Sequence, residues 1–203
     1  MSRSPAALLM VAVLLAGCAG ASPSATPIVS SLASPTATAA GSPGPTCTGE
    51  LTPAQTEGPY FKLGSPEETS LVGSGLPGTP LTLTGFVLGA DCQPVADAAL
   101  DFWQADDSGA YDNAGYTLRG HLTADAAGRF SLGTIVPGLY PGRTRHIHVK
   151  VQAPGGPLLT TQLYLPDDPN NASDGIYDAK LVMAVQPAGG GLAATFTFVV
   201  ATR

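Results

Sequence analysis

The sequence PGLYPGRTRHIHVKV, from Pro137 to Val151, decides how the rest of the chain is interpreted. Its second half alternates polar and apolar residues, which is the pattern of a β-strand whose successive side chains point to opposite faces. His146, His148 and Lys150 therefore share one face of the expected strand, and the other face is apolar. Two imidazoles on one face can bind a single transition-metal ion. An edge strand with its polar face in solvent explains the same pattern, so the two histidines alone do not distinguish a metal site from a solvent-exposed strand.

The chain around this stretch is expected to form an all-β domain. Seven short runs are rich in Val, Leu, Thr or Phe, are bounded by Gly, Pro, Asp or Asn, and have no competing helical period. Closely spaced strands without intervening helices predict a single β-sandwich domain over residues 47–203. The expected strands are residues 80–88, 99–105, 128–136, 145–152, 159–165, 179–185 and 194–201.

Composition excludes two classes of partner. The 203 residues include 9 Lys and Arg against 15 Asp and Glu, which gives a formal net charge of −6, and no segment gathers the basic residues into a patch. Nucleic acid and anionic lipid headgroups are bound mainly through clustered positive charge. We therefore expect neither of them as a partner.

The N-terminus is typical of an exported bacterial lipoprotein. Residues 1–17 combine Arg3, an apolar run too short to span a membrane and a small-residue cleavage site, and these are the parts of a signal peptide. The sequence Leu-Ala-Gly-Cys that ends at Cys18 resembles the bacterial lipobox, whose cysteine is lipidated. A cytosolic protein with an apolar N-terminal helix is the alternative, but no amphipathic period supports it.

Residues 18–46 are expected to be a disordered tether. They consist almost entirely of Ala, Ser, Thr, Pro and Gly, carry no charge, and cannot bury enough apolar surface to offset the entropy of ordering. The tether would hold the domain away from a bacterial membrane, at the cell surface or in a periplasm, with the lipid on Cys18 as the one membrane contact.

Two cysteines remain once Cys18 carries lipid. Cys47 opens the expected domain and Cys92 lies in the turn GADCQP. A pair of cysteines in an exported protein usually forms a disulfide. Two unrelated buried thiols are the alternative, because the sequence gives no distance between them.

Five segments carry more distinctive residues than strands and turns require. They are LTPAQTEGPYF (51–61), DFWQADDSGAYDNAG (101–115), LRGHLTADAAGRFSLGTIVPGLY (118–140), GRTRHIHVKV (142–151) and LTTQLYLP (159–166). Together and in this order they resemble the intradiol ring-cleavage dioxygenases, which include catechol and protocatechuate dioxygenases. The likeness is closest to the exported, single-domain branch of that family, and it implies the family's β-sandwich.

The resemblance implies an iron(III) ion held by two tyrosines and two histidines. His146 and His148 match the paired histidines, and Tyr140 matches the tyrosine that leaves the metal when substrate binds. The second tyrosine is Tyr111, which follows Trp103 and Gly109 at the family's spacing, with Tyr116 as the alternative. The other tyrosines singled out are expected to be ordinary residues at the edge of the core; they are Tyr60, Tyr164 and Tyr177.

The chemistry of these donors suits iron(III). A phenol becomes an anionic oxygen ligand only when a strong positive charge displaces its proton. Two phenolates, two neutral imidazoles and one hydroxide balance the charge of iron(III), which favours it over iron(II).

The implied activity is the cleavage of a catechol-type ring by O₂ between the two hydroxyl-bearing carbons, with a cis,cis-muconate-type product. Tyr140 would take a substrate proton as it leaves the metal. Arg143 matches the arginine that stabilises negative charge on the ring, and Gln162 matches a glutamine of the same site. Without the resemblance they would be read as a solvated loop charge and a strand-surface amide.

Two residues depart from the family pattern. Arg145 stands directly before His146, where it could attract an acidic catechol or face water, and His121 is expected at the surface. The N-terminal helical dimerisation segment of cytosolic catechol dioxygenases is not matched, so the oligomeric state stays open, as does the identity of the catechol.

A different class of function is the principal alternative. A tethered β-sandwich can be a non-catalytic cell-surface module that binds polysaccharide or protein, because a fold does not establish an activity. Such a module has no use for two tyrosines, two histidines and an arginine together. A copper or zinc protein that uses only the HxH pair leaves both tyrosines unexplained.

Overall fold

The structure is a computed structural model that describes residues 45–203, and it contains eight β-strands and one short 3-10 helix. The all-β sandwich expected from the sequence is confirmed. The elements are β1 (Pro80–Gly89), β2 (Ala99–Trp103), β3 (Arg119–Thr123), β4 (Arg129–Ile135), β5 (His146–Gln152), β6 (Leu158–Tyr164), η1 (Ala179–Leu181), β7 (Ala184–Ala188) and β8 (Gly191–Val200).

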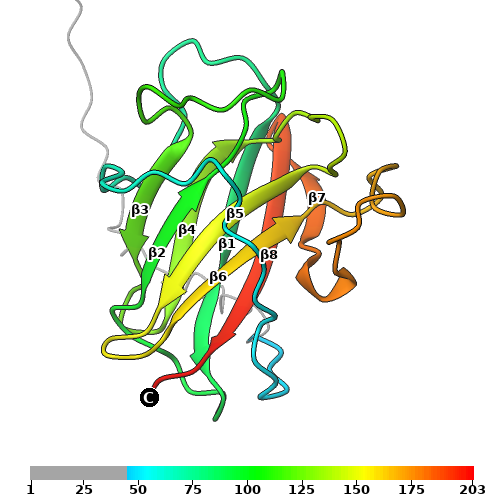
Figure 1. Ribbon diagram of the computed structural model, residues 1–203. Helices are drawn as coiled ribbons and strands as arrows, with labels where there is room; N and C mark the ends of the chain where they lie inside the picture. Colours follow the sequence, from blue (N-terminus) through cyan, green and yellow to red (C-terminus); the bar gives the residue numbers. More distant parts are fainter. Residues whose placement is uncertain (1–44) are drawn as a thin grey trace, which may run out of the picture. The chain divides into compact units, whose positions relative to one another are not determined.

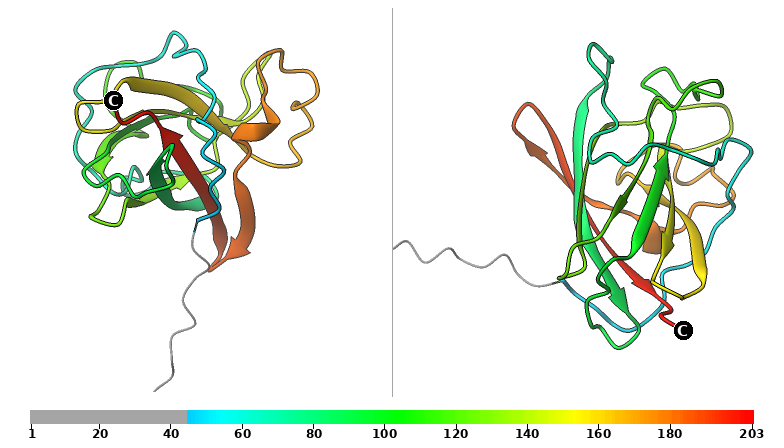
Figure 2. Two further views of the ribbon diagram at one scale, coloured as in Figure 1. Left: turned by 90° about the horizontal axis from the view of Figure 1, so that it is seen from below. Right: turned by 90° about the vertical axis from the view of Figure 1, so that its left-hand side faces the viewer.

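The strands form two four-stranded sheets. One sheet has the order β4-β1-β8-β7 and the other the order β3-β2-β5-β6. Only β1 and β8 pair in parallel among these strands, and all other pairs are antiparallel. Figure 1 and the right-hand view of Figure 2 show the two sheets lying face to face.

The core lies between the sheets because each strand alternates its side chains. On β5, Ile147, Val149 and Val151 are fully buried, and Leu83 of β1 and Phe198 of β8 lie in the same core cluster. Complete burial of an aliphatic or aromatic side chain stabilises a fold by roughly 1.5–3 kcal/mol. The apolar face of the HIHVKV run thus anchors β5 in the core and leaves its polar face on the outside of the sheet.

Two parts of the strand prediction were wrong. The run 119–123 was not expected to be a strand, because Gly120 is unfavourable in strands and conceals a short alternating pattern. This glycine is required by packing, since a Cβ on it would lie 2.6 Å from Cδ2 of Leu71. The run expected at 179–185 is instead a 3-10 helix followed by β7, and Asp178 caps that helix by accepting a hydrogen bond from Lys180 N–H.

The segment from Cys47 to Leu71 covers the outer face of the β3-β2-β5-β6 sheet. The backbone N–H of Gln55 donates to Thr160 on β6, and that of Glu68 donates to His121 on β3. These bonds satisfy both edges of the sheet, which would otherwise present free pairing groups. Figure 1 shows this segment crossing in front of β5 and β2.

The register of the sheet gathers three long loops at one end. Trp103 at the end of β2 pairs with Arg119 at the start of β3 and with His148 near the start of β5. His146, the first residue of β5, pairs with Tyr164, the last residue of β6. The loops 104–118, 136–145 and 165–178 therefore all leave the sandwich beside the HxH pair.

Residues 1–44 are not described. The predicted signal peptide (1–17), the lipidated Cys18 and nearly all of the tether (18–46) lie there. Within residues 45–203, no helix is long and apolar enough to cross a membrane.

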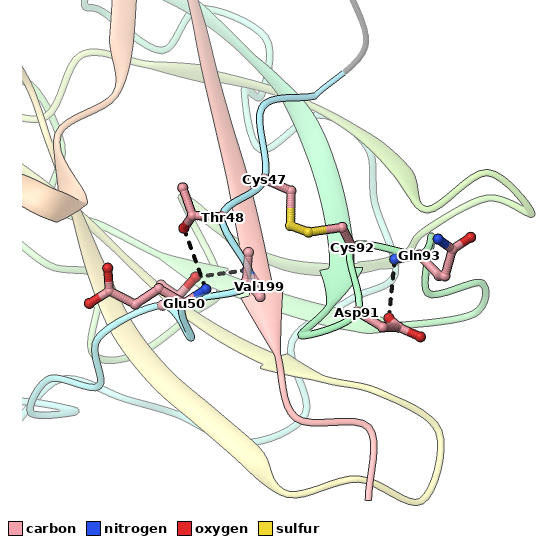
Figure 3. The surroundings of a disulfide bond; sticks show 8 residues. Cys47, Thr48, Glu50, Asp91, Cys92, Gln93 and Val199 are labelled. Atoms are coloured by element: carbon pink, nitrogen blue, oxygen red, sulfur yellow. Dashed lines mark hydrogen bonds between the residues drawn. A yellow bond between two sulfur atoms is a disulfide. The ribbon is translucent and has the colours of Figure 1, made fainter.

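A disulfide joins the beginning of the described chain to the sandwich (Figure 3). Cys47 is bonded to Cys92, which lies in the turn after β1, and the two are 45 residues apart in sequence. Shortly after Cys47, the N–H of Thr52 donates to the carbonyl of Val199 on β8, and the N–H of Val199 donates to Thr52 Oγ1. The covering segment is therefore fixed to the sandwich where it starts.

Replacing both Cys47 and Cys92 by serine is expected to lower the free energy of unfolding by about 4 kcal/mol, because a closed loop of 45 residues no longer restricts the unfolded chain. Urea unfolding followed by circular dichroism measures this change. Cys18→Ser is the matched control and should leave the midpoint unchanged. An equal midpoint for the double variant and the parent would contradict this role of the bond.

Candidate metal centre

Four predicted donor side chains meet at the loop-bearing end of the sheet. His146 and His148 come from β5, Tyr111 from the loop after β2, and Tyr140 from the loop after β4. The Nε2 atoms of the two histidines are 3.1 Å apart, and the phenol oxygens of Tyr111 and Tyr140 each lie 3.5 Å from Nε2 of His146. Residues separated by up to 37 positions in the sequence thus converge on one point.

The histidine pair is buried. Strand β5 lies between β2 and β6, and the exposed fractions of His146 and His148 are 2% and 1%. The edge-strand interpretation of the HxH pattern is therefore wrong. Two polar rings on the outer face of an internal strand are covered by the loops and by the segment that begins at Cys47.

Hydrogen bonding determines which nitrogen of His146 faces the cluster. Its Nδ1 is 2.6 Å from the carbonyl oxygen of Thr144, and a carbonyl can only accept, so Nδ1 carries the proton. Nε2 of His146 then presents a lone pair to Tyr111, Tyr140 and His148. Only one of these three groups can share a proton with that lone pair at a time, whereas a cation between them can be bound by all four side chains together.

The donor set fits a metal ion. Separations of 3.1–3.5 Å are those of ligand atoms around one ion with bonds of about 2 Å. Within residues 45–203 no cluster of three or more His, Cys, Asp or Glu side chains offers an alternative metal site. Two hard phenol oxygens and two imidazoles suit a highly charged transition-metal ion such as iron(III).

Burial sets the protonation of the four groups in the metal-free protein. It raises the pKa of the Tyr111 phenol well above its ordinary value, with a further increase from neighbouring Tyr140. It also raises the pKa of Tyr140, although Arg143 opposes the change. It lowers the pKa of His146 to about 4 and that of His148 well below its usual value. The histidines are therefore neutral and ready to bind metal, whereas the phenols lose their protons only beside a strong positive charge.

Two glycines allow the tyrosine-bearing loops to touch. Gly109 has a φ of +88°, and a Cβ on it would lie 2.1 Å from the carbonyl oxygen of Leu139. A Cβ on Gly138 would lie 2.3 Å from the nitrogen of Gly109. The backbones preceding Tyr111 and Tyr140 therefore pack directly against each other, which brings the two phenols to the same end of β5.

The structure separates the two candidates for the first tyrosine. Tyr116 donates its hydroxyl hydrogen to the carbonyl of Leu63, and its exposed fraction is 37%. Tyr111 faces the histidines instead. Tyr116 therefore lies outside the cluster.

Arg143 uses all three of its side-chain nitrogens beside the cluster. Nη1 donates to the phenol oxygen of Tyr140 at 3.2 Å, Nη2 donates to Oε1 of Gln162 at 2.5 Å, and Nε donates to the carboxylate of Asp174 at 2.8 Å. Burial alone would raise the pKa of Asp174, but hydrogen bonds from Thr144 N–H and Arg143 outweigh it and lower that pKa. Asp174 thus stays ionised and holds the guanidinium against Tyr140.

Gln162 connects this group to the covering segment. It lies directly opposite His148 in the register of β5 and β6, and its Nε2 donates to the carbonyl of Thr56. The predicted residues Arg143 and Gln162 are therefore both next to the donor cluster and bonded to each other.

The comparison with known proteins agrees with this geometry. Residues 56–201 match the family model described as "Dioxygenase" (Dioxygenase_C). The chain belongs to the intradiol ring-cleavage dioxygenase family. The match includes the donor cluster, Arg143, Gln162 and both sheets.

Individual relatives of the family match at different levels. The dioxygenase domain of a dioxygenase carbohydrate-binding protein fusion from Streptomyces sp. SirexAA-E is 57% identical, with a TM-score of 0.74 over 76% of this chain and 100% of that chain. Hydroxyquinol 1,2-dioxygenase of Nocardioides simplex is 31% identical over 169 residues, and catechol 1,2-dioxygenase 2 of Acinetobacter lwoffii is 31% identical over 165 residues. The matches cover 70% and 68% of this chain but only 58% and 60% of those two relatives.

Some residues around the donor cluster were not predicted from the sequence. The ring of Trp103 stacks on that of His148 with centroids 4.8 Å apart, and the ring of Tyr60 stacks on that of Tyr111 at 4.3 Å. Tyr164 donates its hydroxyl hydrogen to Gln55. Trp103 and Tyr60 lie in motifs that were recognised, and Tyr164 follows Gln162 by two positions, so strand alternation places it on the same face of β6.

Arg145 and His121, the two residues that depart from the family pattern, each contact another residue of the domain. Arg145 Nη1 is 2.8 Å from the carboxylate of Asp168, so its charge is matched within the protein. His121 is half-buried on β3, where its Nδ1 lies 2.8 Å from the carbonyl oxygen of Ser65. The expectation of a surface histidine was wrong because residues 65–68 cover that edge of the sheet.

The metal-free protein is expected to lose stability as the pH falls. His146 has a pKa of about 4 in the fold, whereas an exposed histidine in the unfolded chain takes up a proton near 6.5. Its contribution is complete above pH 6.5 and is lost as the pH falls towards 4, which amounts to roughly 3 kcal/mol. Denaturant unfolding at several pH values between 7.5 and 4 measures this loss.

The variants His146→Gln and His121→Gln test whether the buried histidine pair, and not a histidine elsewhere in the chain, causes this pH dependence of stability. The first should reduce the pH dependence, because only the contribution of His148 remains, and the second should retain it in full. A His146→Gln protein with the pH dependence of the parent would contradict the assignment.

Proposed function

We propose that this family member is an iron(III)-dependent dioxygenase that cleaves catechol-type rings with O₂ between the two hydroxyl-bearing carbons and forms cis,cis-muconate-type products. The observation that carries the proposal is the convergence of Tyr111, Tyr140, His146 and His148 on one buried point. The alternative, a surface module that binds polysaccharide or protein, gives no reason for such a cluster.

The four donors would hold the metal, and their neighbours would keep them in place. Iron(III) held by these four side chains would supply the Lewis acidity that makes a catechol ring reactive towards O₂. Trp103 stacked on His148 and the hydrogen bond from His146 to Thr144 orient the two imidazoles.

Tyr140 is the ligand suited to exchange with the substrate. Its phenol oxygen accepts a hydrogen bond from Arg143 Nη1 at 3.2 Å, whereas the ring of Tyr111 is held under the stacked ring of Tyr60. As this oxygen leaves the cluster it can take a proton from the catechol, and the guanidinium beside it retains the phenol near the site.

Arg143 is the group suited to charge that develops on the ring. Its position is set by Asp174 and Gln162 rather than by solvent, so it needs little rearrangement during the reaction. Gln162 in turn is bonded to Thr56, which ties the catalytic side chains to the segment that keeps water from β5.

The proposed substrate carries no carboxylate. Arg143 and Arg145, the cations next to the cluster on the same loop, are each bonded to an aspartate. Catechol and hydroxyquinol fit this charge pattern, and they appear in the names of the relatives described above.

Visible spectroscopy with iron analysis tests the proposal directly. The protein reconstituted with iron(III) should show a tyrosinate-to-iron(III) charge-transfer band that shifts when catechol is added without oxygen. Tyr111→Phe and Tyr140→Phe should lose or displace the band, and Tyr140→Phe should lower kcat by about 100-fold or more because a proton acceptor is removed. Tyr116→Phe is the matched control and should retain both band and turnover.

The assay should use catechol and hydroxyquinol, with protocatechuate as the carboxylated comparison. A folded protein that stays colourless after iron reconstitution and does not respond to catechol would exclude the enzyme and favour the binding module.

We also propose that the protein is exported and anchored through lipid on Cys18, from the Leu-Ala-Gly-Cys sequence that resembles a lipobox. In bacterial cells the full chain should incorporate labelled palmitate and partition into detergent, and Cys18→Ser should do neither. Equal labelling of the two chains would exclude this anchor.

A further inference from the structure

Arg119 is a buried cation next to the metal centre that the family resemblance assigns no role. It is the first residue of β3, its exposed fraction is 2%, and it lies opposite Trp103 in the sheet. Within residues 45–203 it takes part in none of the ion pairs. A buried arginine without a carboxylate is unusual, because removing its charge from water is unfavourable unless other groups compensate.

The partners of Arg119 are two backbone carbonyls. Nη1 donates to the carbonyl of Tyr60 at 2.6 Å, and Nε donates to the carbonyl of Asp112 at 2.9 Å. Nη2 is buried and has no hydrogen-bond partner within the described chain. The centre of the guanidinium lies 6.0 Å from the centroid of the Tyr111 ring.

These two bonds, which we call the Arg119 bridge, join segments that are far apart in sequence. Tyr60 belongs to the segment that covers the sheet, and Asp112 directly follows the candidate ligand Tyr111. Where the two backbones are held together, the rings of Tyr60 and Tyr111 stack with centroids 4.3 Å apart and planes inclined by 18°. A planar guanidinium can hold two acceptors in a fixed relation, which an ammonium group cannot do.

The loop that carries Tyr111 needs such an attachment. Its side after Tyr111 is a compact turn in which the carboxylate of Asp112 accepts hydrogen bonds from the N–H groups of Ala114, Gly115 and Thr117. These bonds are internal to the loop, so they shape it without fixing it to the sheet. The Arg119 bridge supplies the connection from β3.

We propose that Arg119 and Tyr60 are positioning residues that hold Tyr111 in the orientation required to bind the metal, with the guanidinium of Arg119 supplying positive charge near the Tyr111 ring. The effect on metal binding rests on the proposed function, whereas the geometry of the bridge and of the ring stack does not. The bridge and the ring stack exist in the metal-free protein and can be tested there.

Lys62 provides a matched control. Like Arg119 it is a cation that donates to two backbone carbonyls, but both of them, those of Ala114 and Gly115, lie in the loop that carries Tyr111. It lies over the ring of Tyr116 at 4.2 Å rather than near Tyr111. Lys62→Gln therefore weakens the attachment of the loop without removing the bridge or the stack.

The test uses the full chain with Arg119→Lys, Tyr60→Leu and Lys62→Gln. In the metal-free state, the ring-proton chemical shifts of Tyr111, measured by NMR with labelled tyrosine, should show the ring-current effect of stacking. Arg119→Lys should remove most of that effect although it retains the charge, and Lys62→Gln should preserve it. Iron(III) affinity, measured by competition with a chelator, should fall at least tenfold in Arg119→Lys and Tyr60→Leu and stay within about twofold in Lys62→Gln.

Each outcome decides the inference. A folded Arg119→Lys protein with parental Tyr111 shifts and iron affinity would overturn it, as would a loss of affinity in Lys62→Gln equal to that in the other two. If Arg119→Lys does not fold, Tyr60→Leu decides through affinity, because the side chain of Tyr60 is only half-buried and is not part of the core. If the parent binds no iron, the proposed function fails, and the metal-free shifts of Arg119→Lys still accept or reject the bridge.

Discussion

The Nε2 atoms of His146 and His148 face each other 3.1 Å apart inside the protein. This close contact constrains the protonation and the position of both rings. Both rings are buried, so neither can readily accept a proton, and the hydrogen bond to Thr144 leaves His146 with a lone pair directed inward. A lone pair enclosed in this way needs a proton or a cation. Because β5 is internal and its apolar face lies in the core, the pair cannot move out to water. The fold therefore presents an electron-rich point that a metal ion can satisfy.

The two tyrosines beside this point have different charged neighbours. The two phenols are neutral in the absence of metal, since burial opposes their ionisation. Arg143 contacts Tyr140 and is itself neutralised by Asp174, whereas Arg119 lies near Tyr111 and has no carboxylate. The two tyrosines thus differ in their surroundings although they are the same residue type. Tyr140 faces a guanidinium that is paired with Asp174, whereas Tyr111 lies under the ring of Tyr60, near a guanidinium that forms no ion pair within residues 45–203.

The sequence predicted the parts of this site that depend on local pattern. Strand alternation was sufficient to place both histidines of β5 on one face and to predict the sandwich. The two tyrosines of the cluster could be predicted only from the resemblance, because their convergence depends on a backbone contact between two loops at Gly109 and Gly138. The role of Arg119 could not be predicted for a related reason. Its strand was not expected from the sequence, and its partner Tyr60 is 59 residues away. Contacts between distant segments leave no periodic signal in the chain.

The stacking of Trp103 on His148 has a practical consequence. Trp103 is the single tryptophan of the chain, and its ring lies nearly parallel to the imidazole, with 8° between the planes. All indole emission of the protein therefore originates against one side of the histidine and tyrosine cluster. An excited indole stacked on an imidazole responds to a change in the electronic state of that ring. The molecule thus contains an intrinsic optical reporter, which can follow the filling of the centre in real time without a dye.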